Sequence, residues 1–84
     1  CAKVAGIGHD GLARAINPVH TMFDGDTLFA MATGSAEPMD VFSFQGLLAL
    51  AGDCVTRAVG RGVLAAESAG AMRSFRDAFP SALR

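Results

Sequence analysis

The sequence has no tryptophan and no tyrosine, and neither sign of charge is in excess. Seven basic residues stand against eight acidic ones, which gives a formal net charge of −1 at pH 7. Proteins that bind nucleic acids need positive charge for the phosphate backbone, and many use aromatic rings for base stacking. We therefore expect no nucleic acid among the partners of this protein.

Long apolar runs are also missing. The unbroken run from Leu47 to Ala51 is far too short for a membrane-spanning helix, which needs about 20 apolar residues. We expect no membrane partner. No signal peptide is visible, and the chain begins with Cys1 rather than Met, so we expect that processing or fragmentation produced this end.

Cysteine is scarce, because Cys1 and Cys54 are the only two. Two cysteines do not make a disulfide framework, and Cys54 lies in an Ala- and Leu-rich segment where a buried free thiol is expected. Free thiols favour a reducing compartment, so we expect a cytoplasmic location. An amino-terminal thiol can act as a nucleophile with its own amine as base, but Cys1 falls within a helical pattern with no strand leading from it.

Apolar residues are abundant for so short a chain. They make up 51% of the 84 residues, and the mean hydropathy is +0.37. A chain of this length buries only about 60–65% of the surface that it exposes when unfolded. We expect the surplus to be covered by a partner chain, a second copy or a missing remainder of the domain, so a homo-oligomer is anticipated.

The spacing of apolar residues predicts helix, strand and two further helices. Residues 1–16 form a helix that Asn17-Pro18 ends, and residues 17–26 form a loop. Residues 27–33 form a strand that is apolar on both faces and therefore covered from both sides. After a connection over 34–40, Asp40 or Ser43 caps a helix over 44–68, and a short helix follows over 72–79.

These elements predict an α/β fold class. A strand buried on both faces belongs in a layered architecture and needs neighbouring strands, which this sequence does not supply. The chain is therefore expected to be a part of a larger fold. Small residues such as Gly8 and Gly52 are expected to let neighbouring elements approach closely.

The candidate catalytic residues are Asp24 and Asp26, which flank Gly25 at the mouth of the predicted strand. Side chains at positions i and i+2 of an extended chain project to the same side, so the two carboxylates can share a site. Such a pair can orient a nucleophile or relay its proton. The spacing alone leaves open a plain turn and a metal loop, although Ser35 stands where a calcium loop would close with glutamate.

His9 and His20 are further candidates of a different kind. A metal or catalytic role for His9 would need a partner, and the end of the helix separates it from His20 in sequence. A solvent-facing or structural role is therefore expected for His9.

Four motifs resemble one known family in combination. They are His9-Asp10-Gly11-Leu12-Ala13-Arg14-Ala15-Ile16, Pro18-Val19-His20-Thr21, Asp24-Gly25-Asp26-Thr27 and Phe29-Ala30-Met31-Ala32-Thr33-Gly34. The series is similar to the carboxy-terminal part of the L-aminopeptidase/D-amidase-esterase family, which includes β-peptidyl aminopeptidases and the nylon-oligomer hydrolase. The later helices agree more loosely.

The resemblance implies a self-cleaving amino-terminal-nucleophile hydrolase with a four-layer α/β/β/α sandwich. Residues 1–84 would be the carboxy-terminal portion of its small chain. The small chain's new amino-terminal Ser or Thr would attack the substrate, its own amine acting as base. Asp24 and Asp26 match an aspartate pair that assists this nucleophile in the nylon-hydrolase branch; the β-aminopeptidase branch has a hydroxyl residue and a glutamate instead.

The resemblance also implies which parts of the site and which partners lie elsewhere. The nucleophile would lie upstream of Cys1, and the oxyanion-hole groups would belong to the large chain of the same precursor. The substrates would be small peptides, amides or esters, and neither a metal nor an organic cofactor would be needed. Two alternatives stay open: acyl transfer of the ornithine acetyltransferase type, and a non-catalytic helical interaction subunit.

Overall fold

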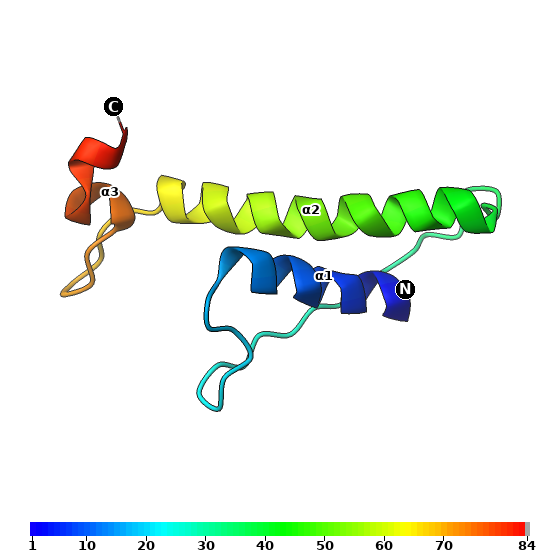
Figure 1. Ribbon diagram of the computed structural model, residues 1–84, viewed down its shortest axis with the longest axis horizontal. Helices are drawn as coiled ribbons and strands as arrows, with labels where there is room; N and C mark the ends of the chain where they lie inside the picture. The colour runs from blue at the N-terminus through cyan, green and yellow to red at the C-terminus, as the bar shows by residue number, and fades with distance from the viewer. Residues whose placement is uncertain (84) are drawn as a thin grey trace.

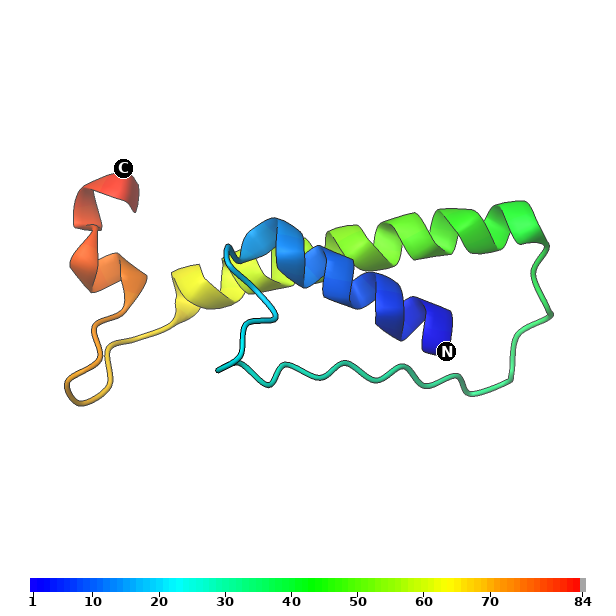
Figure 2. The same cartoon turned by 60° about the horizontal axis from the view of Figure 1, so that its bottom comes forward.

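The computed structural model describes residues 1–83, which form an extended helical arrangement. In chain order its elements are α1 (Ala2–Ala15), α2 (Val41–Ala65), α3 (Phe75–Ala78) and the 3-10 helix η1 (Pro80–Leu83). Helices α1 and α2 lie side by side and run in the same direction (Figure 1). Because two parallel helices cannot be joined by a tight turn, residues 16–40 must carry the chain back along α1 before α2 begins (Figure 2).

Helix α1 confirms the prediction of a helix over residues 1–16 to within one residue at each end. Ile16 leaves the helix with an extended backbone while its N–H still donates to the carbonyl of Leu12. The following Asn17–Pro18 peptide bond is cis. The helix therefore ends where the proline was expected to end it, since a residue before proline avoids the α conformation.

Helix α2 starts and ends three residues earlier than predicted. Of the two candidate caps, Asp40 is the one used, and its carboxylate accepts a hydrogen bond of 2.7 Å from the backbone N–H of Ser43. This bond and the one from the Ser43 side chain favour the ionised carboxylate, so the pKa of Asp40 lies below its ordinary value. At the other end Ala66 turns to an extended backbone, which stops the helix before Ser68.

The junction between α1 and α2 depends on glycine, as predicted for Gly8 and Gly52. Both glycines are buried, and so is Gly11. A Cβ atom at Gly11 would collide with the carbonyl oxygen of Gly52 and would lie 2.9 Å from the Cβ of Val55. The two backbones approach so closely that only a hydrogen atom fits at this position.

A hydrogen bond and an ion pair also join the two helices. The hydroxyl of Thr56 lies 2.9 Å from the carbonyl oxygen of Gly11 and 3.1 Å from that of Gly52. Arg14 and Asp53 form an exposed ion pair at 3.6 Å. Since exposed ion pairs contribute only about 0–1 kcal/mol, the close packing and the Thr56 bond define the junction.

The predicted strand over residues 27–33 is not formed in the described part of the chain. The segment follows an extended course (Figure 2), but no neighbouring segment hydrogen-bonds with its backbone to make a ladder. Its alternation is visible on one side, because Leu28 and Ala30 are half-buried against the helices. Phe29 and Met31 on the other side are 90% and 93% exposed, so residues 1–83 do not themselves supply the cover expected for that face.

The final helix is shorter than the prediction of 72–79. Ala69 and Met72 exchange two backbone hydrogen bonds across a turn in which Gly70 has a positive φ of 57°. Met72 is the residue of this turn that the prediction gave to the helix, and Ser74 then caps α3, which begins at Phe75. Within α3 and its end, the rings of Phe75 and Phe79 lie 5.3 Å apart, and α3 touches the end of α2.

The described residues enclose almost no hydrophobic core. Leu48 is the one large apolar side chain among them that is buried, at 6% exposure. The radius of gyration is 16.2 Å, whereas a compact domain of this length would have about 12 Å. The surplus of apolar residues noted in the sequence therefore stays on the surface of this chain. No helix in residues 1–83 is both long enough and apolar enough to cross a membrane.

Candidate active site

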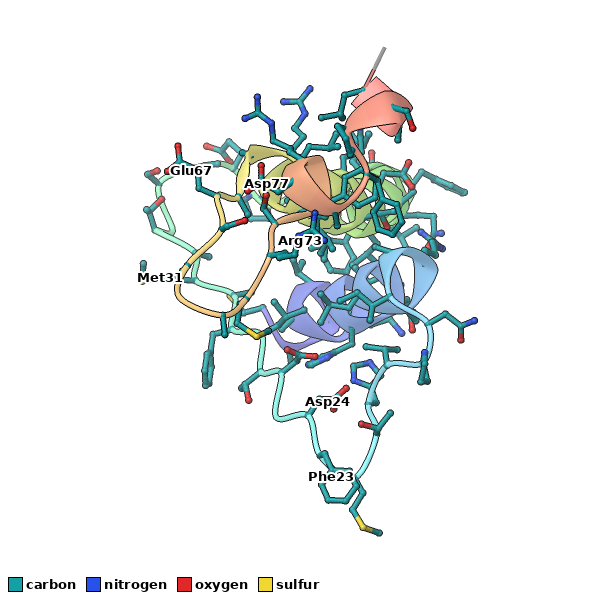
Figure 3. The ribbon with its side chains drawn as sticks, turned by 90° about the vertical axis from the view of Figure 1, so that its left-hand side faces the viewer. Phe23, Asp24, Met31, Glu67, Arg73 and Asp77 are labelled. Atoms are coloured by element: carbon teal, nitrogen blue, oxygen red, sulfur yellow. The ribbon has the colours of Figure 1, made fainter. Side chains whose placement is uncertain are left out.

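The two candidate aspartates lie on the loop that follows α1. Residues 21–27 are all exposed, and the loop projects away from the helices with Phe23 at its tip and Asp24 close by (Figure 3). The only hydrogen bonds within it are short-range. The N–H of Phe23 donates to the Thr21 hydroxyl at 3.4 Å, and the Thr27 hydroxyl donates to the carbonyl of Gly25 at 3.2 Å.

The side chains of Asp24 and Asp26 are unengaged within residues 1–83. Both are exposed, and neither carboxylate has a hydrogen-bond or ion-pair partner there. The oxygens are therefore accessible to a donor brought from elsewhere. Within residues 1–83, therefore, the two carboxylates contact no second catalytic group and make no structural hydrogen bond or ion pair.

The loop is held at its two ends by adjacent residues of α1. On the upstream side, the rings of His9 and His20 meet edge to face with their centroids 5.0 Å apart. On the downstream side, Leu28 lies over Gly8, where a Cβ atom would come within 2.8 Å of its Cδ1. One turn of α1 therefore anchors both ends of the segment that carries the aspartates.

The contact between His9 and His20 was not foreseen from the sequence. The end of the helix was expected to separate them, but the chain reverses over residues 16–19 and places His20 back against α1. His9, for which a solvent-facing or structural role was expected, is half-buried, and its ring contacts that of His20. A chain reversal after a helix leaves no periodic signal, so sequence spacing alone does not reveal such a pair.

A second polar cluster, at the carboxy-terminal end, was also missed. The Ser68 hydroxyl donates to the carboxylate of Asp77 and accepts a hydrogen bond of 2.8 Å from the N–H of Ser74. The Ser74 hydroxyl caps α3 by accepting from the N–H of Asp77, and Arg73 donates to the Asp77 carbonyl at 2.7 Å (Figure 3). The spacing of Ser74 and Asp77 is that of a helix N-cap, which is the one signal available in the sequence.

Cys1 and Cys54 are free thiols, but Cys54 is exposed, so its expected burial is wrong. It lies beside Arg57 and Arg61, on a part of α2 that the close contact with α1 leaves uncovered. Among residues 1–83 no three His, Cys, Asp or Glu side chains converge as metal ligands would.

Comparison with known proteins agrees with the motifs around this loop. The model of peptidase family S58 matches residues 1–76. Proteins named uncharacterized aminopeptidase from Mycobacterium tuberculosis and Mycobacterium bovis are each 41% identical to 98% of this chain. One of the same description from Mycobacterium leprae is 44% identical over the same share.

The matched region is only a part of each relative. The chain spans about a quarter of their length, 27% for the first two and 26% for the third. No solved structure gives a convincing match. Because the family model covers nine-tenths of the chain and includes the whole aspartate loop, this chain belongs to peptidase family S58, the L-aminopeptidase family.

Proposed function

We propose that the protein to which this chain belongs is an aminopeptidase or amidase that acts through an amino-terminal Ser or Thr nucleophile. The observation that supports this most directly is the Asp24-Gly25-Asp26 loop within a chain of peptidase family S58. The nucleophile attacks a small peptide, amide or ester, and water then hydrolyses the acyl-enzyme. Residues 1–84 contribute the aspartates, while the nucleophile and the oxyanion hole come from outside them.

Asp24 and Asp26 assist the nucleophile in this proposal. A carboxylate that lacks a partner within its own chain can accept a hydrogen bond from an amine or hydroxyl that another segment presents. Both carboxylates are of this kind, and they lie on an exposed loop with fixed ends. In the reaction they would orient the nucleophile and hold or relay its proton, a contribution typical of general acid–base catalysis.

The large chain of the same precursor is the partner we propose for the exposed apolar side chains. Met22, Phe23, Phe29 and Met31 are each at least 90% exposed within 84 residues that account for about a quarter of their relatives. Cover for the outer face of residues 27–33 would be supplied by the remaining layers of an α/β/β/α sandwich. Part of the helical surface would contact a further copy in a homo-oligomer.

The test is a pair of isosteric substitutions in the whole protein. Asp24→Asn and Asp26→Asn remove the negative charge while keeping the size of each side chain. We expect each to lower kcat for an amino-terminal amide substrate by roughly 10²–10⁴-fold, the usual contribution of an acid–base group, with the melting temperature unchanged. Glu37→Gln, an exposed carboxylate outside the loop, is the matched control and should keep the wild-type rate.

Wild-type rates in both aspartate variants would contradict the proposed role and leave the loop a plain turn. Two competing functions are tested in the same assay. Preferential transfer of the acyl group to an amino-acid acceptor rather than to water would favour the acetyltransferase type. The other alternative is an interaction subunit, whose binding surface would be the exposed apolar side chains. It predicts that the whole protein releases no product from any amide or ester.

A further inference from the structure

We propose that the histidine pair, His9 and His20, positions the aspartate loop, and that ring packing rather than proton transfer is its task. This inference rests on the proposed function, because it assigns two positioning residues to the same site. Neither imidazole is counted among the groups that act on the substrate. The contact instead fixes where the backbone of residues 21–27 starts.

The backbone at His20 supports this role. His20 is the one non-glycine residue in the described chain with a positive φ, at 57°. Side chains other than glycine adopt this left-handed conformation uncommonly, and it persists where surrounding contacts determine it. The ring of His20, an exposed residue, packs edge to face on the ring of His9 at a centroid separation of 5.0 Å. Such a geometry is favourable for aromatic rings.

The position of His9 in α1 explains why this contact matters for the loop. His9 follows Gly8, which contacts Leu28, so that two neighbouring residues of one rigid helix hold the chain before and after the aspartates. The seven residues between these anchors, 21–27, are exposed and bonded only among themselves. Without the contact between His9 and His20, only the contact of Leu28 with Gly8 would hold the aspartate loop against α1.

Catalysis is sensitive to such placement, since a misplacement of 1 Å can cost about 10²-fold in rate. Asp24 lies four positions after His20, a span of at most about 14 Å when extended. Between the two residues the structure gives only the hydrogen bond from the Phe23 N–H to the Thr21 hydroxyl, so a displacement of His20 is expected to displace Asp24 as well. Because the proposal gives the pair a positioning task and no contact with substrate, it should influence turnover more than substrate affinity.

The experiment compares three substitutions at His20 in the whole protein. His20→Ala removes the ring, and His20→Phe keeps a ring but no imidazole. His20→Asn removes the ring while suiting the left-handed backbone. We expect Ala and Asn to lower kcat by roughly 10–10²-fold with KM changed less than about threefold, and we expect Phe to restore most of the rate.

A second readout needs no substrate. Backbone NMR order parameters over residues 21–27 should be lower in His20→Ala and His20→Asn than in the wild type and in His20→Phe, while amide hydrogen exchange in α1 and α2 stays the same. If the wild type hydrolyses nothing, the proposed function fails, yet these order parameters still decide the positioning role.

Two outcomes would overturn the inference. Wild-type order parameters over residues 21–27 in His20→Ala would show that the pair does not hold the loop. A His20→Phe variant as slow as His20→Ala, with wild-type order parameters, would show that the imidazole acts chemically rather than by packing. Should His20→Ala lose exchange protection throughout α1 and α2, the His20→Asn and His20→Phe pair carries the comparison.

Discussion

The helices α1 and α2 and the segment 21–33 contain similar proportions of apolar residues. They differ in how closely other parts of the same chain pack against them. At the junction, Gly11 and Gly52 bring two backbones together, and Thr56 hydrogen-bonds across them. In the segment, Phe29 and Met31 project from an extended backbone that has no ladder partner among residues 1–83. One region is complete within this chain, whereas the other is not.

The contrast separates two kinds of information in one sequence. The contacts between α1 and α2 are made within the chain itself, and small residues such as Gly11 and Gly52 allow them. Met22, Phe23, Phe29 and Met31 are at least 90% exposed in the described chain. The layered fold that we propose therefore requires other polypeptide to bury them. Three substitutions test this difference, and their expected effects decrease from the first to the last.

Phe29→Ala should have the largest effect, and only in the whole protein. If other polypeptide covers Phe29, deleting the ring there leaves a cavity and costs about 3–5 kcal/mol of unfolding free energy. In the isolated 84-residue chain the same change should leave the helical circular dichroism signal unaltered, because Phe29 is 90% exposed. Urea unfolding of the whole protein measures the first quantity.

Leu28→Ala is the matched control for this pair of measurements. Leu28 contacts Gly8 of α1 within the chain, so its loss should weaken the structure in both contexts. An equal and small effect of Phe29→Ala in both contexts would mean that the outer face of the segment stays uncovered, contrary to our account.

Gly11→Ala should have the next largest effect, because the new methyl group collides with the carbonyl of Gly52 and the side chain of Val55. Forcing the helices apart should cost about 1–3 kcal/mol in the whole protein, as overpacking usually does. Gly6→Ala lies on the same helix with nothing within 4 Å of the added atom, and it should gain up to about 1 kcal/mol from helix propensity. Denaturant midpoints of equal shift and sign would refute the close approach.

Asp40→Ala should have the smallest effect, a shift of the melting temperature by a few degrees or less, since it removes only a cap. The folded state favours the Asp40 carboxylate and lowers its pKa, so its contribution to stability is present in full above the ordinary aspartate pKa of about 3.9. It is lost as the pH falls through the lowered folded value. The difference between wild type and variant should therefore vanish in strongly acidic buffer.

Asp40→Asn distinguishes the cap from the charge. Asparagine caps helices as well as aspartate does, so this variant should keep the stability near pH 7 but lose the acid dependence. Melting curves of the three proteins between about pH 2 and pH 7 make the measurement. A difference between wild type and Asp40→Ala that grows on acidification would contradict the observed cap.

Local signals in the sequence predicted the helices well. The proline at position 18 and the apolar spacing fixed α1, and the competition between Asp40 and Ser43 left the start of α2 uncertain by three residues. The strand over 27–33 could not be confirmed by this chain, because a strand consists of hydrogen bonds to other segments. The last helix begins at Phe75 rather than residue 72, because Met72 pairs with Ala69 across a turn and Ser74 is the residue that caps α3.

For the candidate site, the sequence supplied the residues but not their support. Asp24 and Asp26 were singled out by type, spacing and family resemblance, and their catalytic role stays a prediction. The contact of His9 with His20 depends on how the chain reverses after α1, which no short-range pattern encodes. The anchors of a loop are therefore the part of a site that only a three-dimensional structure reveals.

The most direct test of the central claim is the intact mass of the whole protein under denaturing conditions. Our account predicts two chains from one precursor, with residues 1–84 in the smaller chain, downstream of an amino-terminal Ser or Thr. A single uncleaved species that nevertheless hydrolyses amino-terminal amides at full rate would contradict the self-cleaving nucleophile on which the proposed role of Asp24 and Asp26 depends.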